Sequence, residues 1–223
     1  MKIAVLFSGG KDSVYATWLS MLQGFDIAVL ISLKPENPES YMFHHPNIEL
    51  TKLQAQAAGF KHKLVKTKGG KEEELADLKR ALKGLGIDGV VSGAIESEYQ
   101  KERVERICWE LGLRSFAPLW RKNQETIAHE EAQALEAIIV SVSAEGLGRE
   151  WLGRHYDPAC VSDLIKLNRR FGISICGEGG EFETLVLNAP FFKKRLHLDD
   201  CAIEWKGSSG VLSVKKASLV AIH

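Results

Sequence analysis

Long apolar runs, a net charge and closely spaced cysteines are all missing from this chain of 223 residues. No apolar stretch approaches the ~20 residues of a membrane-spanning helix, and residues 1–2 lead directly into a predicted strand. We therefore expect no membrane span, no signal peptide and a cytoplasmic location. Lysine plus arginine equals aspartate plus glutamate at 29 each, so no overall positive field exists to hold nucleic acid.

The four cysteines lie far apart and form no Cys-x-x-Cys pair: Cys108, Cys160, Cys176 and Cys201. This spacing favours buried thiols in a reducing compartment. Internal repeats and low-complexity linkers are also absent, so the two halves of the chain should pack closely. With 45% hydrophobic and 26% charged residues, the composition is typical of a globular protein with a substantial core.

A glycine-rich segment follows the first apolar run. Residues 8–13 read Ser-Gly-Gly-Lys-Asp-Ser, and a helix-like sequence begins at their end. This order predicts a strand, a tight turn and a helix whose N-terminal N–H groups attract an anion. Lys11 neutralises phosphate charge, Ser8 and Ser13 offer hydroxyl donors, and Asp12 is a candidate Mg²⁺ ligand. The segment suits a polyphosphate, although it lacks the Walker A spacing, and a plain glycine turn is the alternative.

Strands and helices alternate through the first half, which predicts an α/β fold with a doubly wound parallel sheet. The predicted strands cover residues 3–7, 26–33, 62–67 and 88–94. The predicted helices follow the glycine-rich segment and cover 47–58, capped by Asn47 and stopped by Gly59, as well as 72–82 and 96–108.

The sequence pattern changes near Arg121, so we predict two domains, 1-120 and a smaller α/β domain at 121-223. The second half contains predicted helices at 124–135 and 158–171, a strand at 137–143 and further strands with a hairpin turn at 206–210.

Ligands in doubly wound folds sit beyond the carboxyl ends of the strands. Ser32 and Leu33 end the second predicted strand and are placed to touch a base, unless they simply close the strand. A loop is expected over 35–40. The adjacent His44 and His45 point in different directions without a nearby carboxylate, so we expect no metal site there.

The fourth predicted strand leads through the small residue Gly93 to the start of helix 96–108. Tyr99, Gln100 and Arg103 lie near that start, where nucleotide and substrate would be handled, and a solvated helix end is the competing interpretation. A second glycine-rich segment, residues 177–184, reads Gly-Glu-Gly-Gly-Glu-Phe-Glu-Thr. It is a candidate substrate loop, and a tight turn with solvated acids is the alternative.

Together these motifs resemble the diphthine–ammonia ligase family of PP-loop ATP pyrophosphatases, over nearly the whole chain. The likeness rests on residues 8–13, 93–100 with Arg103, the Pro-Leu-Trp of 118–120, the motifs at 146–153 and residues 177–184. The resemblance implies a HUP-like ATP-binding domain followed by a substrate-binding domain. It also implies that diphthine of translation elongation factor 2 is amidated with ammonium, through an acyl-adenylate, with release of AMP and pyrophosphate.

The resemblance implies site residues as well. ATP and Mg²⁺ would be held by the loop and the strand ends: Ser8, Gly9, Gly10, Lys11, Asp12 (also the Mg²⁺ ligand), Ser13, Ser32, Leu33 and Gly93. Diphthine would contact Ser97, Tyr99, Gln100, Arg103, Trp120, Glu178, Gly179, Gly180, Glu181, Phe182, Glu183 and Thr184. Catalysis would fall to Lys11, Asp12, Arg103, Glu181 and Glu183.

The trimethylammonium group of diphthine cannot donate hydrogen bonds, so carboxylates or aromatic faces must recognise it. Trp120, Tyr99 and Phe182 are therefore candidate walls, and Glu181 and Glu183 are candidate contacts for substrate or ammonium. Arg103 is a candidate clamp for the α-phosphate or the substrate carboxylate.

Two other functions remain open from the sequence. A PP-loop enzyme acting on tRNA is disfavoured by the balanced charge and the lack of a cysteine pair, and a regulatory module would bind ATP without splitting it. The elongation factor and ammonium are the expected partners, with no membrane and no nucleic acid. A homodimer is an open option.

Overall fold

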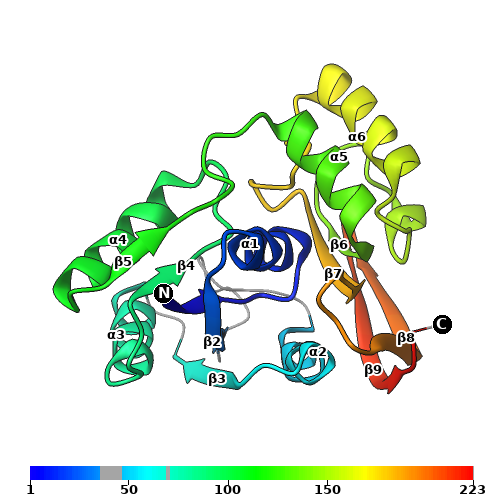
Figure 1. Cartoon of the computed structure of the whole chain (residues 1–223). Helices are drawn as coiled ribbons and strands as arrows, with labels where there is room; N and C mark the ends of the chain where they lie inside the picture. The colour runs from blue at the N-terminus through cyan, green and yellow to red at the C-terminus, as the bar shows by residue number, and fades with distance from the viewer. Residues whose placement is uncertain (36–46, 69–70, 223) are drawn as a thin grey trace.

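The computed structural model describes residues 1–35, 47–68 and 71–222. Residues 36–40 of the expected loop, and both His44 and His45, lie outside the described residues. The sequence prediction of a parallel α/β half followed by a smaller second half is confirmed, as the element order in Figure 1 shows.

The first sheet has five parallel strands in the order β3-β2-β1-β4-β5. Its strands are β1 (Lys2–Leu6), β2 (Asp26–Pro35), β3 (His62–Thr67), β4 (Gly89–Val91) and β5 (Arg114–Phe116). The central strand β1 is almost continuously apolar and buried, because helices cover both of its faces. The strand order reverses at β1, so the loop after β1 lies at a topological switch point.

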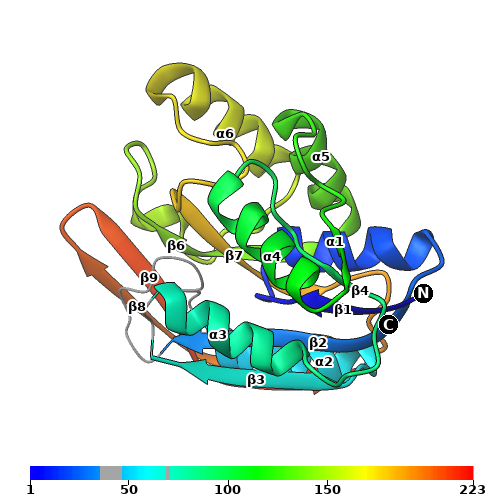
Figure 2. The same cartoon turned by 90° about the vertical axis from the view of Figure 1, so that its left-hand side faces the viewer.

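Helices pack on opposite faces of this sheet, which makes it doubly wound (Figure 2). On one face Ile3 and Val5 of β1 share a core with α1 (Lys11–Leu22) and α2 (Thr51–Ala58). On the other, Ala4 and Leu6 pack with α3 (Lys71–Leu82) and α4 (Glu98–Glu110). Successive strand side chains point to opposite faces, so one strand serves both cores.

The second sheet has four antiparallel strands in the order β7-β6-β9-β8. Its strands are β6 (Glu136–Val142), β7 (Phe182–Asn188), β8 (Arg195–Lys206) and β9 (Ser209–Val220). The helices of this half are α5 (Gln124–Ala134) and α6 (Pro158–Phe171), and short 3₁₀ turns lie at Ile48–Leu50 and Arg149–Trp151. The predicted hairpin turn joins β8 to β9, and α6 coincides with its prediction.

One of the two hydrophobic cores runs through both halves, which confirms the prediction that they pack closely. It contains Phe7 and Val14 from the first half together with Ile139 and Leu185 from the second. Helix α1 lies between the two sheets in Figure 1. The loop that precedes α1 is thereby placed where the two halves meet.

One predicted helix boundary is wrong. Asn47 was expected to cap a helix over 47–58, but it has a left-handed φ of 64° and its side chain caps nothing. Instead Asn47 Nδ2 donates to Leu212 O at 2.9 Å and its Oδ1 accepts from Val214 N at 2.8 Å, so it ties this turn to β9. Tertiary hydrogen bonds thus replace the local cap, and α2 begins at Thr51. Gly59 does stop α2 in a left-handed conformation.

Candidate functional site

The predicted phosphate loop lies at the end of β1 and is braced by its own last residue. Ser13 Oγ accepts hydrogen bonds from Ser8 N and Gly9 N, both at 3.2 Å, and donates to Gly10 O at 3.1 Å. Ser8 Oγ and Ser13 Oγ are 3.1 Å apart. The loop is therefore held by a small neutral group, and the positive helix terminus behind it attracts anions.

Glycine is required at the first loop position by conformation and by space. Gly9 has a φ of +81°, and a Cβ there would meet Gln54 Oε1 at 2.2 Å. The Gln54 amide Nε2 donates to Gly9 O at 2.9 Å and to Val186 O at 2.8 Å. Gly93, predicted to bind nucleotide, packs against the start of α1, where a Cβ would lie 2.8 Å from Asp12 C and Ser13 N.

Strand β7 of the second sheet closes the other side of the loop. Lys11 N donates to Thr184 Oγ1 at 3.0 Å, and Val186 N donates to Gly9 O at 3.0 Å. The first of these bonds satisfies one of the amide groups that every helix N-terminus leaves unpaired. The structure therefore brings Thr184, from the second glycine-rich segment, directly to the phosphate loop.

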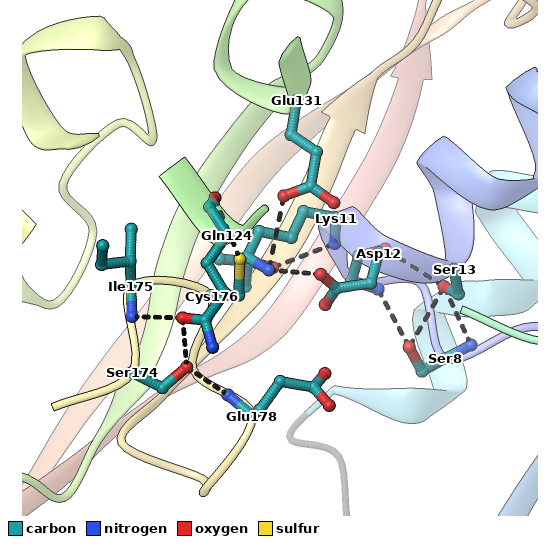
Figure 3. Close-up of polar contacts among 12 residues, drawn as sticks. Ser8, Lys11, Asp12, Ser13, Gln124, Glu131, Ser174, Ile175, Cys176 and Glu178 are labelled. Carbon is teal, nitrogen blue, oxygen red and sulfur yellow. Dashed lines mark hydrogen bonds and ion pairs between the residues drawn. The ribbon is translucent and has the colours of Figure 1, made fainter. Parts of the chain in front are cut away.

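The side chain of Lys11 is buried, with 1% of its surface exposed. Its Nζ forms an ion pair with Asp12 Oδ1 and lies 3.4 Å from Glu131 Oε2, as Figure 3 shows. The Tyr156 and Phe182 rings lie 5.8 and 5.9 Å from Nζ, measured to their centroids. Burial alone lowers the Lys11 pKa, but Asp12 and Glu131 outweigh it, so the pKa lies well above its usual value and Lys11 is protonated.

Glu131 and Tyr156 are the buried partners that complete this cluster. Burial is the main cause that raises the Glu131 pKa well above its usual value, against the pull of Lys11. Burial also raises the Tyr156 pKa, so the phenol is neutral. Neither Glu131 oxygen has a hydrogen-bond partner among the residues that the structure describes, and the same holds for Tyr156 Oη.

The segment before β7 forms a compact turn that is braced by Glu181. Its Oε1 accepts from Ser174 N at 2.9 Å and its Oε2 from Gly179 N at 2.8 Å. Gly180 has a φ of +80°, and its N donates to the carbonyl of Gly177 at 3.0 Å. Both carboxylate oxygens of Glu181 therefore hold the turn, whereas the sequence had suggested a substrate or ammonium contact for them.

Glu178 joins this turn to the start of α4. Its Oε2 accepts from Glu96 N at 2.9 Å and from Ser97 N at 3.2 Å. Burial, with the nearby Asp12 charge, raises the Glu178 pKa above its usual value despite these hydrogen bonds. Glu178 and Ser97 thus lie together in a half-buried position, and their contact with substrate stays a prediction.

Gln124, at the first turn of α5, fixes the same turn from the other side. Its Oε1 accepts from Ser174 Oγ and Ile175 N, both at 3.1 Å, and Cys176 Sγ lies 3.5 Å from its carbonyl oxygen (Figure 3). Its Nε2 donates to Glu96 Oε2 at 2.9 Å. Burial raises the Cys176 pKa to about 12, so this thiol is protonated and is not a nucleophile at neutral pH.

Other predicted contacts lie within the protein interior. Ser32 Oγ donates to Phe7 O at 2.5 Å and contacts His62 Nε2 at 2.9 Å, and Leu33 is 3% exposed. These two side chains are part of the sheet, and their contact with a base stays a prediction. Phe182 is 2% exposed and its ring faces Lys11, so its contact with substrate stays a prediction.

Glu183 is separated from the loop by the geometry of its strand. Phe182 and Thr184 face the Lys11 cluster, and alternation places the side chain of Glu183 on the opposite face of β7. Glu183 pairs with Ser141 of β6 in the sheet register. The structure therefore brings Thr184 to the loop and leaves Glu183 apart from it.

Helix α4, its cap and the segment after β5 hold the remaining predicted residues. The Arg103 guanidinium lies 3.3 Å from the centroid of the Tyr99 ring, and its Nη1 donates to Tyr99 O at 3.3 Å. Arg103 therefore contacts its own helix, and a clamp on phosphate or carboxylate would need another rotamer. Ser97 begins the helix by accepting from Gln100 N at 3.4 Å. Trp120 lies 5.1 Å from Lys101 Nζ, so its ring already accepts a cation.

Sequence reasoning missed Glu131, Tyr156, Gln124 and Gln54. Glu131 carried a readable signal, because it occupies the apolar stripe of the predicted helix at 124–135, four residues after Ile127. A carboxylate at such a position is buried and must have a partner. The other three residues carry no local signal, since tertiary packing alone brings them to the loop.

Two absences bear on the site. Among the described residues, the structure contains no group of three or more His, Cys, Asp or Glu side chains that could hold a metal ion. A Mg²⁺ ion near the loop would therefore depend on Asp12 and on nucleotide phosphates, a mode of binding that Mg²⁺ commonly adopts. Over the described ranges, no helix is both long and apolar enough to cross a bilayer.

The parallel sheet with a Ser-Gly-Gly-Lys-Asp-Ser loop at its central strand defines the class: an ATP-binding α/β protein of the PP-loop type. Two family models match the chain, the diphthamide synthase N-terminal domain over residues 1–115 and the diphthamide synthase C-terminal domain over residues 123–220. The chain belongs to the diphthine–ammonia ligase family.

Curated relatives agree with this assignment. Diphthine–ammonia ligases of Bos taurus and Homo sapiens are each 32% identical over the whole chain, which covers 92% of their length. The ligase of Schizosaccharomyces pombe is 35% identical over 99% of the chain, which spans only 40% of that longer protein. A predicted subunit of tRNA methyltransferase from Methanocaldococcus jannaschii is 19% identical, covering 85% of this chain and 98% of its own, with a TM-score of 0.47.

Proposed function

We propose that this chain amidates the diphthine residue of translation elongation factor 2, using ATP and ammonium and forming AMP and pyrophosphate through an acyl-adenylate. The observation that carries the proposal is the junction of the two motifs. Thr184 of the Glu-Gly-Gly-Glu-Phe-Glu-Thr segment bonds to Lys11 of the phosphate loop at 3.0 Å. Groups for phosphate and groups for a second substrate thus meet at one place.

The phosphate loop supplies the first step. A carboxylate is a poor acyl donor, so its oxygen must first attack the α-phosphorus of ATP while the α–β bond breaks. The helix N-terminus behind Gly10 attracts the phosphates, and Lys11 is the nearby cation that neutralises the leaving pyrophosphate. Lys11 Nζ is buried against Asp12 and Glu131 here. Its flexible four-carbon stem allows it to turn toward bound phosphates.

The segment between β4 and α4 faces the turn at 174–181 and supplies the second substrate side. Glu178 and Ser97 are joined there by a hydrogen bond, and Trp120 offers an indole face that already contacts Lys101 and Arg121. We propose that Trp120 exchanges these cations for the trimethylammonium group of diphthine, with a gain of about 0.5–2 kcal/mol per ring.

Magnesium and cellular location belong to the same proposal. Asp12, with about a third of its side chain exposed, would hold Mg²⁺ together with the phosphates, and the ion would neutralise their charge. The reaction takes place in the cytoplasm, where the elongation factor works. Pairing with a second copy of the chain stays an open prediction.

The proposal is tested with purified protein, ATP, ¹⁵N-ammonium and elongation factor 2 carrying diphthine. We expect AMP and pyrophosphate in equal amounts, and one ¹⁵N atom at the modified histidine for each AMP. ADP as the product would contradict the acyl-adenylate, and AMP without any change in the factor would contradict the assignment of diphthine as the acyl donor. Elongation factor 2 without diphthine is the control and should release no AMP above background.

A further inference from the structure

The buried surroundings of Lys11 Nζ have a composition that phosphate binding does not explain. We call the space formed by Asp12, Glu131, Tyr156 and Phe182 around this nitrogen the Lys11 slot. It contains an ion pair with Asp12, a Glu131 oxygen at 3.4 Å and two aromatic rings within 6 Å. Every part of it attracts a small cation that donates hydrogen bonds.

The slot contains polar groups that Lys11 leaves without hydrogen bonds. Glu131 is 0% exposed and lies 3.4 Å from Lys11 Nζ, yet neither of its oxygens is hydrogen-bonded to any described residue. Tyr156, at 2% exposed, also has an unpartnered hydroxyl. Buried polar groups without partners are costly, so their presence points to a ligand that uses them.

We propose that the Lys11 slot is the binding site for the ammonium substrate, with the Lys11 side chain occupying it until ATP draws the lysine to the phosphates. This inference rests on the proposed function for the identity of the substrate. An ammonium ion carries the same charge as the Lys11 head group and has a similar shape, with one more N–H donor. The extra donor suits the unpartnered oxygens of Glu131 and Tyr156.

The place of the slot in the fold suits this role. Asp12 belongs to both the phosphate loop and the slot, so ammonium would lie beside the α-phosphate where the acyl-adenylate forms. Glu131 and Tyr156 come from the second half of the chain, as does Thr184 on the loop. Because the Lys11 head group fills the slot, it must move to the phosphates before ammonium can enter, so ATP must bind before ammonium.

Replacement of the lysine tests the slot without any enzymatic reaction. Lys11→Ala empties it and leaves Asp12 and Glu131 without their cationic partner. We expect ammonium chloride to raise the melting temperature of this variant by several degrees, whereas equal concentrations of sodium or tetramethylammonium chloride do not. Lys11→Ala combined with Glu131→Gln should lose this response, while Lys11→Ala combined with Glu125→Gln, an exposed acid on the same helix, should keep it. Equal effects of all three salts would overturn the proposal.

Kinetics give a second, independent test. Glu131→Gln should raise KM for ammonium about tenfold or more, with KM for ATP changed less than about twofold, because one of two oxygens that accept from ammonium alone is lost. Glu125→Gln should change neither constant. Equal rises in both constants, or an unchanged KM for ammonium, would make Glu131 a merely structural residue.

Calorimetry on the unmodified protein covers the case in which the variants do not fold. Ammonium should bind measurably when a non-hydrolysable ATP analogue is present and not when it is absent. Equal ammonium affinity with and without the analogue, or no binding at all, would overturn the proposal that ammonium replaces the Lys11 side chain in the slot. If the protein forms no amide but ammonium still raises the melting temperature of Lys11→Ala, the proposed function fails while the Lys11 slot stands as an ammonium site.

Discussion

The two glycine-rich segments are built alike but differ in what holds them. Residues 8–13 are braced by the Ser13 hydroxyl, which accepts two backbone N–H groups. The start of residues 177–184 is braced by the Glu181 carboxylate, which also accepts two. A neutral brace keeps the first loop attractive to phosphate. A charged brace makes the second turn negative, as a site for a cationic substrate should be.

This difference shows that a conspicuous acid in a motif can have a structural role. Glu181 stands out in the sequence, yet both of its oxygens hold its own turn. Glu131, hidden in an ordinary helix, lies next to the loop lysine. The predictions below separate residues that brace a loop from residues that act on a ligand.

Lys11→Ala should have the largest effect on the reaction. Removal of the cation that neutralises the leaving pyrophosphate should slow AMP formation by about a thousandfold. The rate is measured by AMP release under single-turnover conditions. Lys83→Ala, at an exposed lysine, serves as the control and should leave the rate unchanged. A loss of less than about tenfold would remove Lys11 from the phosphate site.

Gly9→Ala should mainly destabilise the first loop. A Cβ at Gly9 meets Gln54 Oε1 at 2.2 Å, whereas Gly84 has a similar φ of +77° and open space around it. We expect Gly84→Ala to cost about 1 kcal/mol and Gly9→Ala about 3 kcal/mol of unfolding free energy. Urea denaturation measures both values. Equal costs would mean that backbone strain alone, without the packing on Gln54, explains the glycine.

Glu181→Gln and Glu183→Gln compare an acid that holds its own turn with an acid on the face of β7 that points away from Lys11. The amide at position 181 can accept only one of the two N–H groups, so we expect a loss of about 1–2 kcal/mol in stability together with a raised KM for substrate. Glu183→Gln should change stability less. A large loss of kcat in Glu183→Gln at unchanged stability would instead assign Glu183 to the chemistry.

Glu178→Gln should produce the smallest effect, visible in the pH dependence of stability. The folded-state pKa of Glu178 lies above its unfolded value, so the folded protein binds this proton more tightly than the unfolded chain. The carboxyl therefore lowers stability as the pH rises through the folded pKa. Thermal unfolding from pH 4 to pH 8 should show a shallower decline in Glu178→Gln. Parallel curves would contradict the burial of this carboxyl.

Much of the fold could be predicted from the sequence because its signals are local. Continuous apolar runs marked the parallel strands, and Asp157, Pro158 and Gly172 mark both ends of α6. The helix start predicted at Asn47 was wrong because its side chain hydrogen-bonds to β9, more than 160 residues away in the chain. Short β5 carried too little periodicity to be recognised.

The site was predictable only in its first half. Residues 8–13 follow one another in the chain, so their chemistry can be read directly. In the Lys11 slot, Glu131 comes from α5, Tyr156 from the segment before α6, and Phe182 from β7. No local sequence pattern connects these three residues. Side chains alternate between the two faces of β7, so Glu183 and Thr184 could have been assigned to opposite faces. The sequence does not show which of these faces lies toward the phosphate loop.

The most direct measurement of the central claim follows one oxygen atom. Diphthine labelled with ¹⁸O in its carboxylate is mixed with the protein, ATP and ammonium, and AMP is analysed by mass. If the carboxylate attacks the α-phosphorus and ammonia then breaks the C–O bond, one ¹⁸O atom appears in AMP for each amide formed. Unlabelled AMP, formed at the same rate as the amide, would contradict the acyl-adenylate and with it the role given to the phosphate loop.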